Sequence, residues 1–313
     1  MYGGVATYEA LKGKATSLSL VLGPWRHSGM NYDGSTLGPL KFDVDTALAF
    51  RRDVMKPFLD SHLKDQPPRV TTPAAFVYET GTDTWRRLPR WPMATATRTL
   101  ALLANQRASF EPAKDAGYDE YVADPAKPVP YLPRPVRFED TDAWKRWLVT
   151  DQRFVADRPD VLVYTTDKLT APVKLAGAPQ VKLFASTSGS DADWVVKLID
   201  VYPDEVSAQP ELGGYQLGIA MDIFRGRYRD SFEHPTAIPA NETVRYHFAL
   251  PSVDHVFLPG HRIMVQIQSS WFPLYDRNPQ TFVDNIFFAK PADYRKATQR
   301  VFHTSAIDLP VVP

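Results

Sequence analysis

A single histidine in this sequence stands where a catalytic base could act. His27 follows the apolar run 18–22, which ends at Gly23-Pro24 and predicts a short strand buried on both faces. An irregular stretch comes next, and then a helical pattern. Because loops at the carboxyl ends of parallel strands converge on one crevice, a histidine there could accept a proton from a hydroxyl nucleophile and return it to the leaving group. Trp25 and Tyr32, on either side of it, are candidate substrate-binding residues.

The sequence holds no obvious nucleophile for this histidine to activate. It has no Gly-x-Ser-x-Gly elbow and no cysteine. In α/β-hydrolases the chain order is nucleophile, acid and then histidine, so a C-terminal stretch of such an enzyme would keep only the histidine. The alternative is that His27 makes an ordinary structural hydrogen bond. Should the chain alone prove active, Ser28 and Ser35 would be the first nucleophiles to test.

Four other groups of residues have types that could do chemistry, and for each a structural role is favoured. Two nearby carboxylates could begin a calcium loop but are more typical of a hairpin turn, and two histidines around a Pro-Gly turn lack a third metal ligand. An aromatic group could stack on a sugar but is more typical of packing, and a basic turn is expected to be solvated. These groups are Asp191 and Asp193; His255 and His261; Trp271, Phe272 and Tyr275; and Arg225, Arg227 and Arg229. We predict no metal site and no cofactor.

Composition narrows the class of partner. The sequence has 36 basic and 36 acidic residues, which gives no electrostatic reason to expect nucleic acid or an anionic membrane. No apolar run approaches the ~20 residues that a membrane span requires. The absence of cysteine is compatible with a reducing compartment or with a bacterial periplasm, so the compartment is left open.

The hydrophobic period divides the chain into two expected parts. Residues 1–65 carry a short leading helix, the strand before His27 and a helix that Asp45 should cap and Pro57 should kink. Since one parallel strand forms no sheet, this βα unit needs partner strands. Residues 66–313 change to a period of two, which predicts an antiparallel β-sandwich of jelly-roll type with a short helical insertion near 140–149. The expected strands are 75–78, 98–103, 161–165, 181–186, 194–202, 215–223, 243–250, 262–269 and 300–308, and the stretches 111–137 and 202–212 are expected to be irregular. The fold class is therefore mainly β.

Several separated motifs resemble a known group of α/β-hydrolases: the α-amino-acid ester hydrolases, cocaine esterase, glutaryl-cephalosporin acylase and X-Pro dipeptidyl-peptidase. The resemblance covers essentially the whole chain. The matching stretches are Gly23-Pro-Trp-Arg-His-Ser-Gly-Met-Asn-Tyr-Asp-Gly-Ser-Thr-Leu-Gly38, Phe50-Arg-Arg-Asp-Val-Met-Lys-Pro-Phe58, Asp191-Ala-Asp-Trp-Val-Val-Lys-Leu-Ile-Asp-Val-Tyr-Pro203, Leu258-Pro-Gly-His-Arg-Ile-Met-Val-Gln-Ile-Gln-Ser-Ser-Trp-Phe-Pro273 and Asp276-Arg-Asn-Pro279.

The resemblance implies that His27 is the histidine of a Ser-His-acid triad in a hydrolase of esters or amides, such as α-amino-acid esters, β-lactam side-chain acyl groups or X-Pro peptides. The family's serine, acid and oxyanion-hole tyrosine would precede Met1, so the chain alone is expected to be inactive. Expected partners are therefore a small ester or amide substrate and the N-terminal catalytic part, and the family suggests a homo-oligomer and a secreted or periplasmic parent protein. The alternative is a non-catalytic β-sandwich module that binds carbohydrate or a protein.

Overall fold

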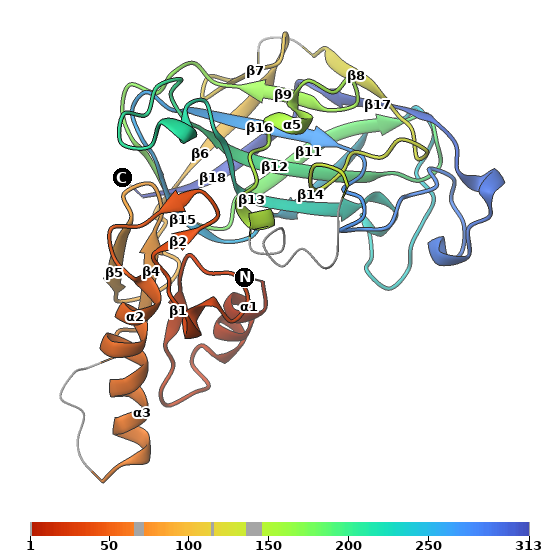
Figure 1. Ribbon diagram of the computed structural model, residues 1–313. Coiled ribbons are helices and arrows are strands. Elements are labelled where there is room, and N and C mark those ends of the chain that lie inside the picture. The colour runs from red at the N-terminus through yellow and green to blue at the C-terminus, as the bar shows by residue number, and fades with distance from the viewer. Residues whose placement is uncertain (1, 66–71, 114–115, 136–145, 313) are drawn as a thin grey trace.

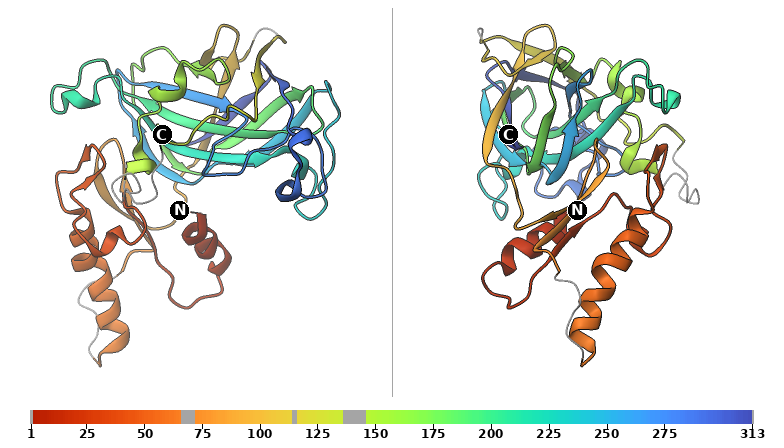
Figure 2. Two further views of the ribbon diagram at one scale, coloured as in Figure 1. Left: turned by 45° about the vertical axis from the view of Figure 1, so that its right-hand side comes forward. Right: turned by 90° about the vertical axis from the view of Figure 1, so that its left-hand side faces the viewer.

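The computed structural model describes residues 2–65, 72–113, 116–135 and 146–312, arranged as a small α/β unit at one end of a large β-sandwich (Figure 1). The helix that follows the His27 loop points away from the sandwich in every view (Figure 2). No helix among the described residues is both long and apolar enough to cross a membrane.

The small unit contains a three-stranded sheet of order β1-β4-β5. Strand β1 (Leu20–Leu22) pairs in parallel with β4 (Ala75–Glu79), and β4 pairs antiparallel with β5 (Thr84–Leu88). The strand predicted at 75–78 therefore exists, but it pairs with the strand before His27 rather than with the sandwich. One partner of β1 therefore lies within the chain, in a stretch that the sequence pattern assigned to the sandwich. The domain boundary near residue 65 stays a prediction.

Both faces of this sheet are covered, as the apolar run predicted. Leu20 and Leu22 face a cluster that includes Tyr8 of helix α1 (Tyr2–Leu11). Val21 lies on the opposite face, against Phe50 at the end of helix α2 (Thr46–Phe50). The helix then continues through a π-helical turn at Arg51–Met55 into α3 (Lys56–Leu63). Proline cannot donate a helical hydrogen bond, and the wider π turn directly precedes Pro57, where the sequence predicted a kink.

The sandwich is antiparallel apart from one short parallel contact between β7 and β9. One layer has the order β13-β12-β16-β9, and the other is built around β11, which pairs with β14, β17 and β18. Its strands are β6 (Ala96–Leu103), β7 (Arg107–Ser109), β8 (Tyr118–Ala123), β9 (Leu162–Thr165), β10 (Val173–Gly177), β11 (Gln180–Thr187), β12 (Asp193–Val201), β13 (Gln216–Arg225), β14 (Val244–Ala249), β15 (Val253–Phe257), β16 (Arg262–Gln268), β17 (Ala297–Phe302) and β18 (Ala306–Val312). The mainly β fold class is confirmed.

The inner faces of the two layers form one apolar core. Trp194 and Leu198 of β12 lie in the same fully buried cluster as Leu183 of β11 and Tyr246 of β14. The alternation predicted for β14 is confirmed, since Tyr246 is buried while Arg245 is exposed. Period-2 patterning places every second side chain in this core.

Two predictions about strands were wrong. The run expected at 300–308 is two strands, β17 and β18, because a turn at 303–305 reverses the chain. The stretch 111–137, expected to be irregular, contains β8, which pairs with β17. Its strand signal is weak because Asp119 and Glu120 interrupt the apolar pattern.

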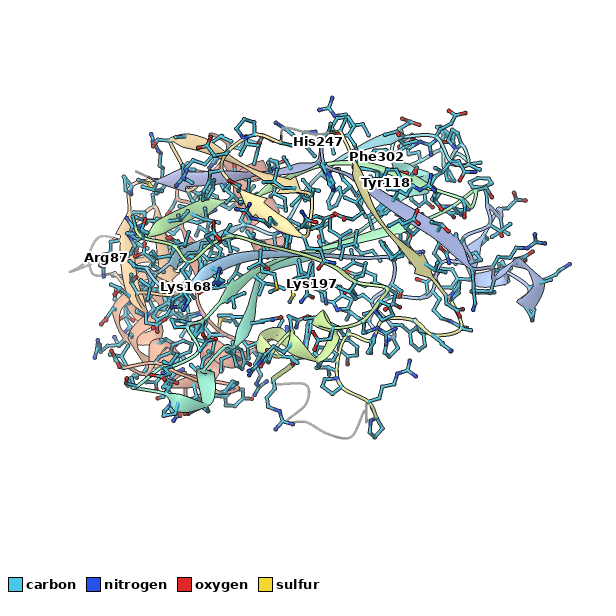
Figure 3. The ribbon with its side chains drawn as sticks, turned by 90° about the horizontal axis from the view of Figure 1, so that it is seen from above. Arg87, Tyr118, Lys168, Lys197, His247 and Phe302 are labelled. Carbon is cyan, nitrogen blue, oxygen red and sulfur yellow. The ribbon has the colours of Figure 1, made fainter. Side chains whose placement is uncertain are left out.

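A third correction concerns the outer face of β16. The period-two pattern set Gln266 and Gln268 at the flanks, opposite Ile263, Val265 and Ile267, but both are fully buried. The segment that holds helix α5 (Arg153–Ala156) contributes to this cover, since the Gln266 side-chain amide lies 3.4 Å from the Gln152 carbonyl oxygen. Lys197 of β12 lies in the same layer, and Figure 3 shows it well inside the outline of the sandwich. Of the helical insertion predicted near 140–149, residues 140–145, including Trp144, lie outside the described residues; Trp147–Val149 form a 3-10 turn.

Candidate functional site

The loop that carries His27 is fixed at its start by Trp25. The Trp25 indole N–H donates a 2.8 Å hydrogen bond to Thr46 Oγ1, and its ring lies 5.3 Å from that of Phe50 and 5.6 Å from that of Trp85. Gly23 makes this possible, because a Cβ there would lie 2.5 Å from the folded-back indole ring. Trp25, which the sequence suggested as a substrate contact, is half-buried and packs against Phe50 and Trp85, and its role in substrate binding stays a prediction.

Beyond His27 the loop is held by hydrogen bonds from the following helix. Arg51 Nη1 donates to the carbonyl oxygens of Met30 (2.6 Å) and Tyr32 (2.8 Å). Ser28 adopts a left-handed backbone (φ 60°) just before the 3-10 turn Gly29–Asn31. A guanidinium that binds the carbonyl groups of Met30 and Tyr32 at once fixes this part of the loop above the helix.

The far end of the loop is fastened to the N-terminus of helix α2. Asp45 Oδ1 accepts from the backbone N–H groups of Leu48 (2.8 Å) and Gly34 (2.9 Å), which confirms Asp45 as the helix cap. Burial alone would raise the pKa of Asp45, but these donors and the charge of Arg51 hold it below its ordinary value. Gly34 has no room for a side chain, since a Cβ would lie 2.6 Å from the backbone nitrogen of Ala47.

His27 itself is exposed at the crest of this loop. Among the residues that the structure describes, no hydrogen bond reaches its imidazole; only its carbonyl oxygen is bound, by Arg26 Nη1 at 3.2 Å. Tyr32 is 60% exposed and lies under the Arg26 guanidinium, 5.7 Å from ring centre to Cζ. Ser35 Oγ, a nucleophile that the sequence left open, donates to Asp33 at 2.5 Å. The structure thus places a free imidazole on a rigid, solvent-facing loop.

The loop also contacts the sandwich. Its hairpin of β2 (Thr36–Leu37) and β3 (Leu40–Lys41) packs Leu37 and Leu40 against a cluster around Val149 and Leu217. An apolar cavity of about 130 Å³ lies at this contact, next to the carboxyl end of β1. The sandwich therefore helps to position the His27 loop, through residues that no local motif distinguishes.

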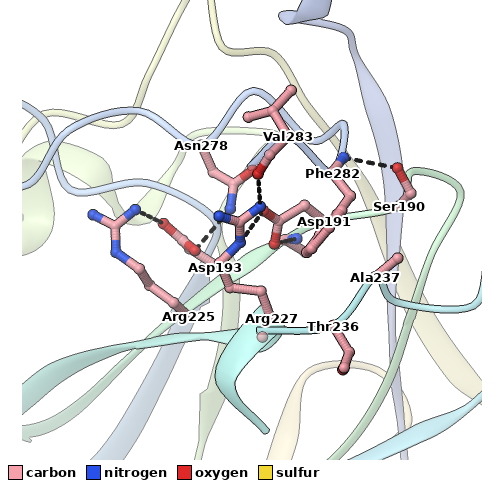
Figure 4. A network of polar contacts seen from close by, with 12 residues as sticks. Ser190, Asp191, Asp193, Arg225, Arg227, Thr236, Ala237, Asn278, Phe282 and Val283 are labelled. Atoms are coloured by element: carbon pink, nitrogen blue, oxygen red, sulfur yellow. Dashed lines mark hydrogen bonds and ion pairs between the residues drawn. The ribbon is translucent and has the colours of Figure 1, made fainter. Parts of the chain in front are cut away.

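The carboxylates at 191 and 193 belong to a buried ion network (Figure 4). Asp191 lies 3.0 Å from Arg227 Nε, and Asp193 Oδ1 accepts from Asn278 Nδ2 at 2.8 Å while Arg225 lies 3.7 Å away. Burial raises the pKa of Asp193 to about 7, although Arg225 opposes the shift. The expectation of a solvated basic turn was wrong for Arg227, which is 2% exposed because it neutralises a carboxylate inside the fold.

The two histidines near the Pro-Gly turn share a carboxylate that sequence reasoning missed. Asp200 Oδ1 lies 2.8 Å from His261 Nδ1, and Asp200 Oδ2 lies 3.3 Å from His255 Nε2. Burial alone would raise the pKa of Asp200, but the two imidazoles lower it. The period-two pattern of the sequence could have placed Asp200 and Lys197 on β12, but it could not have identified the side chains that they contact. Within the described part of the chain, no group of three or more His, Cys, Asp or Glu side chains could hold a metal ion.

Of the aromatic residues Trp271, Phe272 and Tyr275 after β16, Trp271 packs in the interior, as the sequence predicted. Trp271 is 5% exposed, and its ring stacks on Tyr275 at 6.0 Å. The positioning residues Arg51, Thr46 and Gly34 were not singled out from the sequence. The signal available for Arg51 was its place on the first helix after the loop, directly after the buried Phe50.

Comparisons with known proteins agree with this architecture. The family model described as the X-Pro dipeptidyl-peptidase C-terminal non-catalytic domain matches residues 68–308. Cocaine esterase of Rhodococcus sp. (strain MB1 Bresler) is 35% identical over 289 residues, which cover 88% of this chain and 47% of that protein.

Two solved structures superpose on nearly the whole chain. An α-amino acid ester hydrolase gives a TM-score of 0.96 at 53% identity, covering 99% of this chain and 53% of that one. An aminopeptidase from the marine sediment archaeon Thaumarchaeota archaeon gives 0.95 at 51% identity, covering 100% and 52%. The chain spans about half the length of each of these relatives. It belongs to the family of the X-Pro dipeptidyl-peptidase C-terminal non-catalytic domain, and matches the C-terminal part of the cocaine esterase and α-amino-acid ester hydrolase group.

Proposed function

We propose that this chain is the C-terminal part of a serine hydrolase of esters or amides, in which His27 is the general base. The observation that carries the proposal is the free imidazole at the crest of a loop fixed by Trp25, Arg51 and Asp45. A general base must hold one position while its ring stays accessible to the proton it takes. The names of the relatives, an esterase, an ester hydrolase and an aminopeptidase, support hydrolysis of an ester or amide bond.

The serine and the triad acid would lie in an N-terminal part of the protein, which corresponds to the part of the relatives that this chain does not match. Strand β1 supports this, because it lies at the edge of the small sheet in the described chain. Leu20 and Leu22 are nevertheless buried on one face and Val21 is half-buried on the other, as expected of a strand with cover on both faces. A parallel strand from the N-terminal part would extend the sheet there and bring a nucleophile to the same edge as His27.

In such an enzyme the serine hydroxyl would attack the carbonyl carbon and pass its proton to His27. His27 would then give that proton to the leaving alcohol or amine, and water would resolve the acyl-enzyme by the same route. No cofactor enters these steps. The acyl group could belong to an α-amino-acid ester, a β-lactam side chain or an X-Pro peptide.

The test is His27→Ala in the protein expressed together with its upstream coding sequence. We expect kcat for p-nitrophenyl and α-amino-acid esters to fall by about 10⁴ to 10⁶, because loss of a triad member leaves only the residual catalysis of binding and the oxyanion hole. His247→Ala is the matched control, since His247 is exposed on β14 in the sandwich. A His27→Ala enzyme that retains a tenth of the wild-type kcat would remove His27 from the mechanism.

A second measurement tests whether the nucleophile lies outside this chain. The 313-residue chain alone should not hydrolyse these esters above background, because it lacks the nucleophile. Turnover that survives His27→Ala would point to a different site in the chain. Turnover of the chain alone that His27→Ala abolishes would identify a nucleophile within it, with Ser28 and Ser35 tested first.

A further inference from the structure

A second cavity, of about 380 Å³, lies where the His27 loop, the β4–β5 turn and the sandwich meet. Its apolar wall includes Phe42, Leu212, Leu217 and Leu258. Its polar wall includes His261 and Thr80. A concave, mainly apolar space with a few convergent polar groups is the usual form of a small-molecule site.

The polar wall is built and held in place by buried contacts. His261 is 9% exposed, and its Nδ1 lies 2.8 Å from a carboxylate oxygen of the fully buried Asp200. The same carboxylate lies 3.3 Å from His255 Nε2, and His255 Nδ1 lies 2.8 Å from Thr80 Oγ1. A series of contacts thus links His261 to Thr80 through Asp200 and His255, which are both fully buried.

These contacts determine which ring nitrogen of His261 is available to a ligand. His261 Nδ1 is occupied by its 2.8 Å contact with Asp200 Oδ1, which leaves Nε2 as the ring nitrogen that a ligand can bind. Tyr202 lies against the same ring, at 4.8 Å between centres, and also lines the cavity. An aromatic ligand with a hydroxyl group could donate to Nε2 while its ring lies against the apolar wall.

The charged side chains at the rim of the cavity determine the sign of its electrostatic potential. Asp83 and Glu205 are exposed at the cavity, whereas its one lysine, Lys41, is paired with Glu211 at 2.9 Å. The uncompensated charge is therefore negative, which attracts cations and repels anions.

We propose that this cavity is a binding site for a small hydroxylated aromatic molecule that carries a cationic amine. The hydroxyl group binds His261 Nε2, the ring lies against Phe42 and Leu212, and the amine is drawn to Asp83 and Glu205. The site is distinct from the His27 crest, and the inference does not depend on the proposed hydrolase function. Thr80 is not assigned as a nucleophile, because its hydroxyl also donates to the Asp254 carbonyl oxygen at 3.1 Å.

The experiment titrates the full chain with tyramine, 4-hydroxyphenylacetate and phenethylamine. Isothermal calorimetry measures each dissociation constant, and the histidine NMR signals report which imidazole the ligand contacts. Ligands of this size bind with dissociation constants in roughly the millimolar range. We expect tyramine to bind at least tenfold more tightly than 4-hydroxyphenylacetate, which has the opposite charge, and than phenethylamine, which lacks the hydroxyl group.

Two variants locate the site. His261→Phe removes the acceptor, and Ala208→Trp fills the cavity from its exposed wall without touching the buried dyad. Each should weaken tyramine binding at least tenfold. His303→Phe is the matched control, because His303 is also buried beside a carboxylate, 3.1 Å from Asp119, but does not line this cavity. Equal binding by all three variants, no preference for tyramine, or no binding to the wild type would each overturn the proposal.

Discussion

Lys197 shows how strongly the environment of one side chain can change its chemistry. It is fully buried on β12, its Nζ donates to Gln152 Oε1 at 2.9 Å, and it lies 5.5 Å from the centre of the Trp271 ring. In the described part of the chain no carboxylate pairs with it. Desolvation without a counter-ion lowers the pKa of Lys197 to about 7.

The lowered pKa of Lys197 predicts how the free energy of unfolding changes with pH. Between pH 7 and about 10.5 the unfolded chain binds more protons at Lys197 than the folded chain does, so the free energy of unfolding should rise with pH in this window. Lys197→Met removes the effect. The stability of wild type relative to this variant should therefore increase from pH 7 to pH 10, by about 3–4 kcal/mol.

Urea unfolding at several pH values measures the difference. Lys168→Met is the control, since Lys168 is exposed in a surface loop and its replacement should leave the slope with pH unchanged. Parallel curves for wild type and Lys197→Met would show that Lys197 remains charged in the folded protein.

At the scale of helices and strands, the sequence predicted those features that depend on residues close to one another in the chain. Asp45 was predicted as a cap because the capping bond depends on residues three apart, and the alternation of β14 was visible because one of its faces is solvated. Burial of Gln266 was not predictable, because the cover comes from a segment more than a hundred residues earlier. The same limit applies to the candidate site: His27 was visible, but Arg51 and Thr46 act through contacts that only the fold creates.

Asp45→Ala should destabilise the element that holds His27. It removes the acceptor for two backbone N–H groups, one at the start of helix α2 and one in the His27 loop. We expect the free energy of unfolding to fall by about 1–2 kcal/mol, the usual cost of losing a helix cap. Asp43→Ala, two residues away at an exposed position, should change it by less than about 0.5 kcal/mol. Equal effects of the two substitutions in chemical unfolding would contradict the assigned role of Asp45.

At the scale of the whole molecule, the small sheet and the sandwich are joined by both backbone and charge. Thr80 N–H donates to the Asp254 carbonyl oxygen at 3.0 Å, and Val256 N–H donates to that of Thr80 at 2.9 Å. Gly81 has φ +90°, and a Cβ there would lie 2.2 Å from the Val256 oxygen, so only glycine allows this close approach. The two parts are thus expected to unfold in one cooperative transition.

Glu79 supplies the charge at this junction, and its replacement tests the coupling. Its carboxylate pairs with Lys174 of the sandwich and lies 2.7 Å from Arg86 of β5. Burial alone would raise the pKa of Glu79, but Lys174, Thr82 and Arg86 together lower it. Its stabilising contribution should therefore be complete above the ordinary glutamate pKa and be lost as the pH falls through the lower folded value.

Glu79→Gln keeps the shape of the side chain and removes the charge, which leaves Lys174 without its paired carboxylate and Arg86 with only Asp254, 3.9 Å away. We expect the free energy of unfolding at pH 7 to fall by about 2–4 kcal/mol, because uncompensated charge in a largely buried site is costly. The difference from wild type should shrink below pH 4 as Glu79 itself becomes protonated. Glu120→Gln, which breaks the exposed pair with Arg300, is the control and should cost at most about 1 kcal/mol at any pH. Calorimetry and urea unfolding decide the matter: a Glu79→Gln protein that is as stable as the control, or whose deficit does not change with pH, would show that the junction is held by backbone pairing alone.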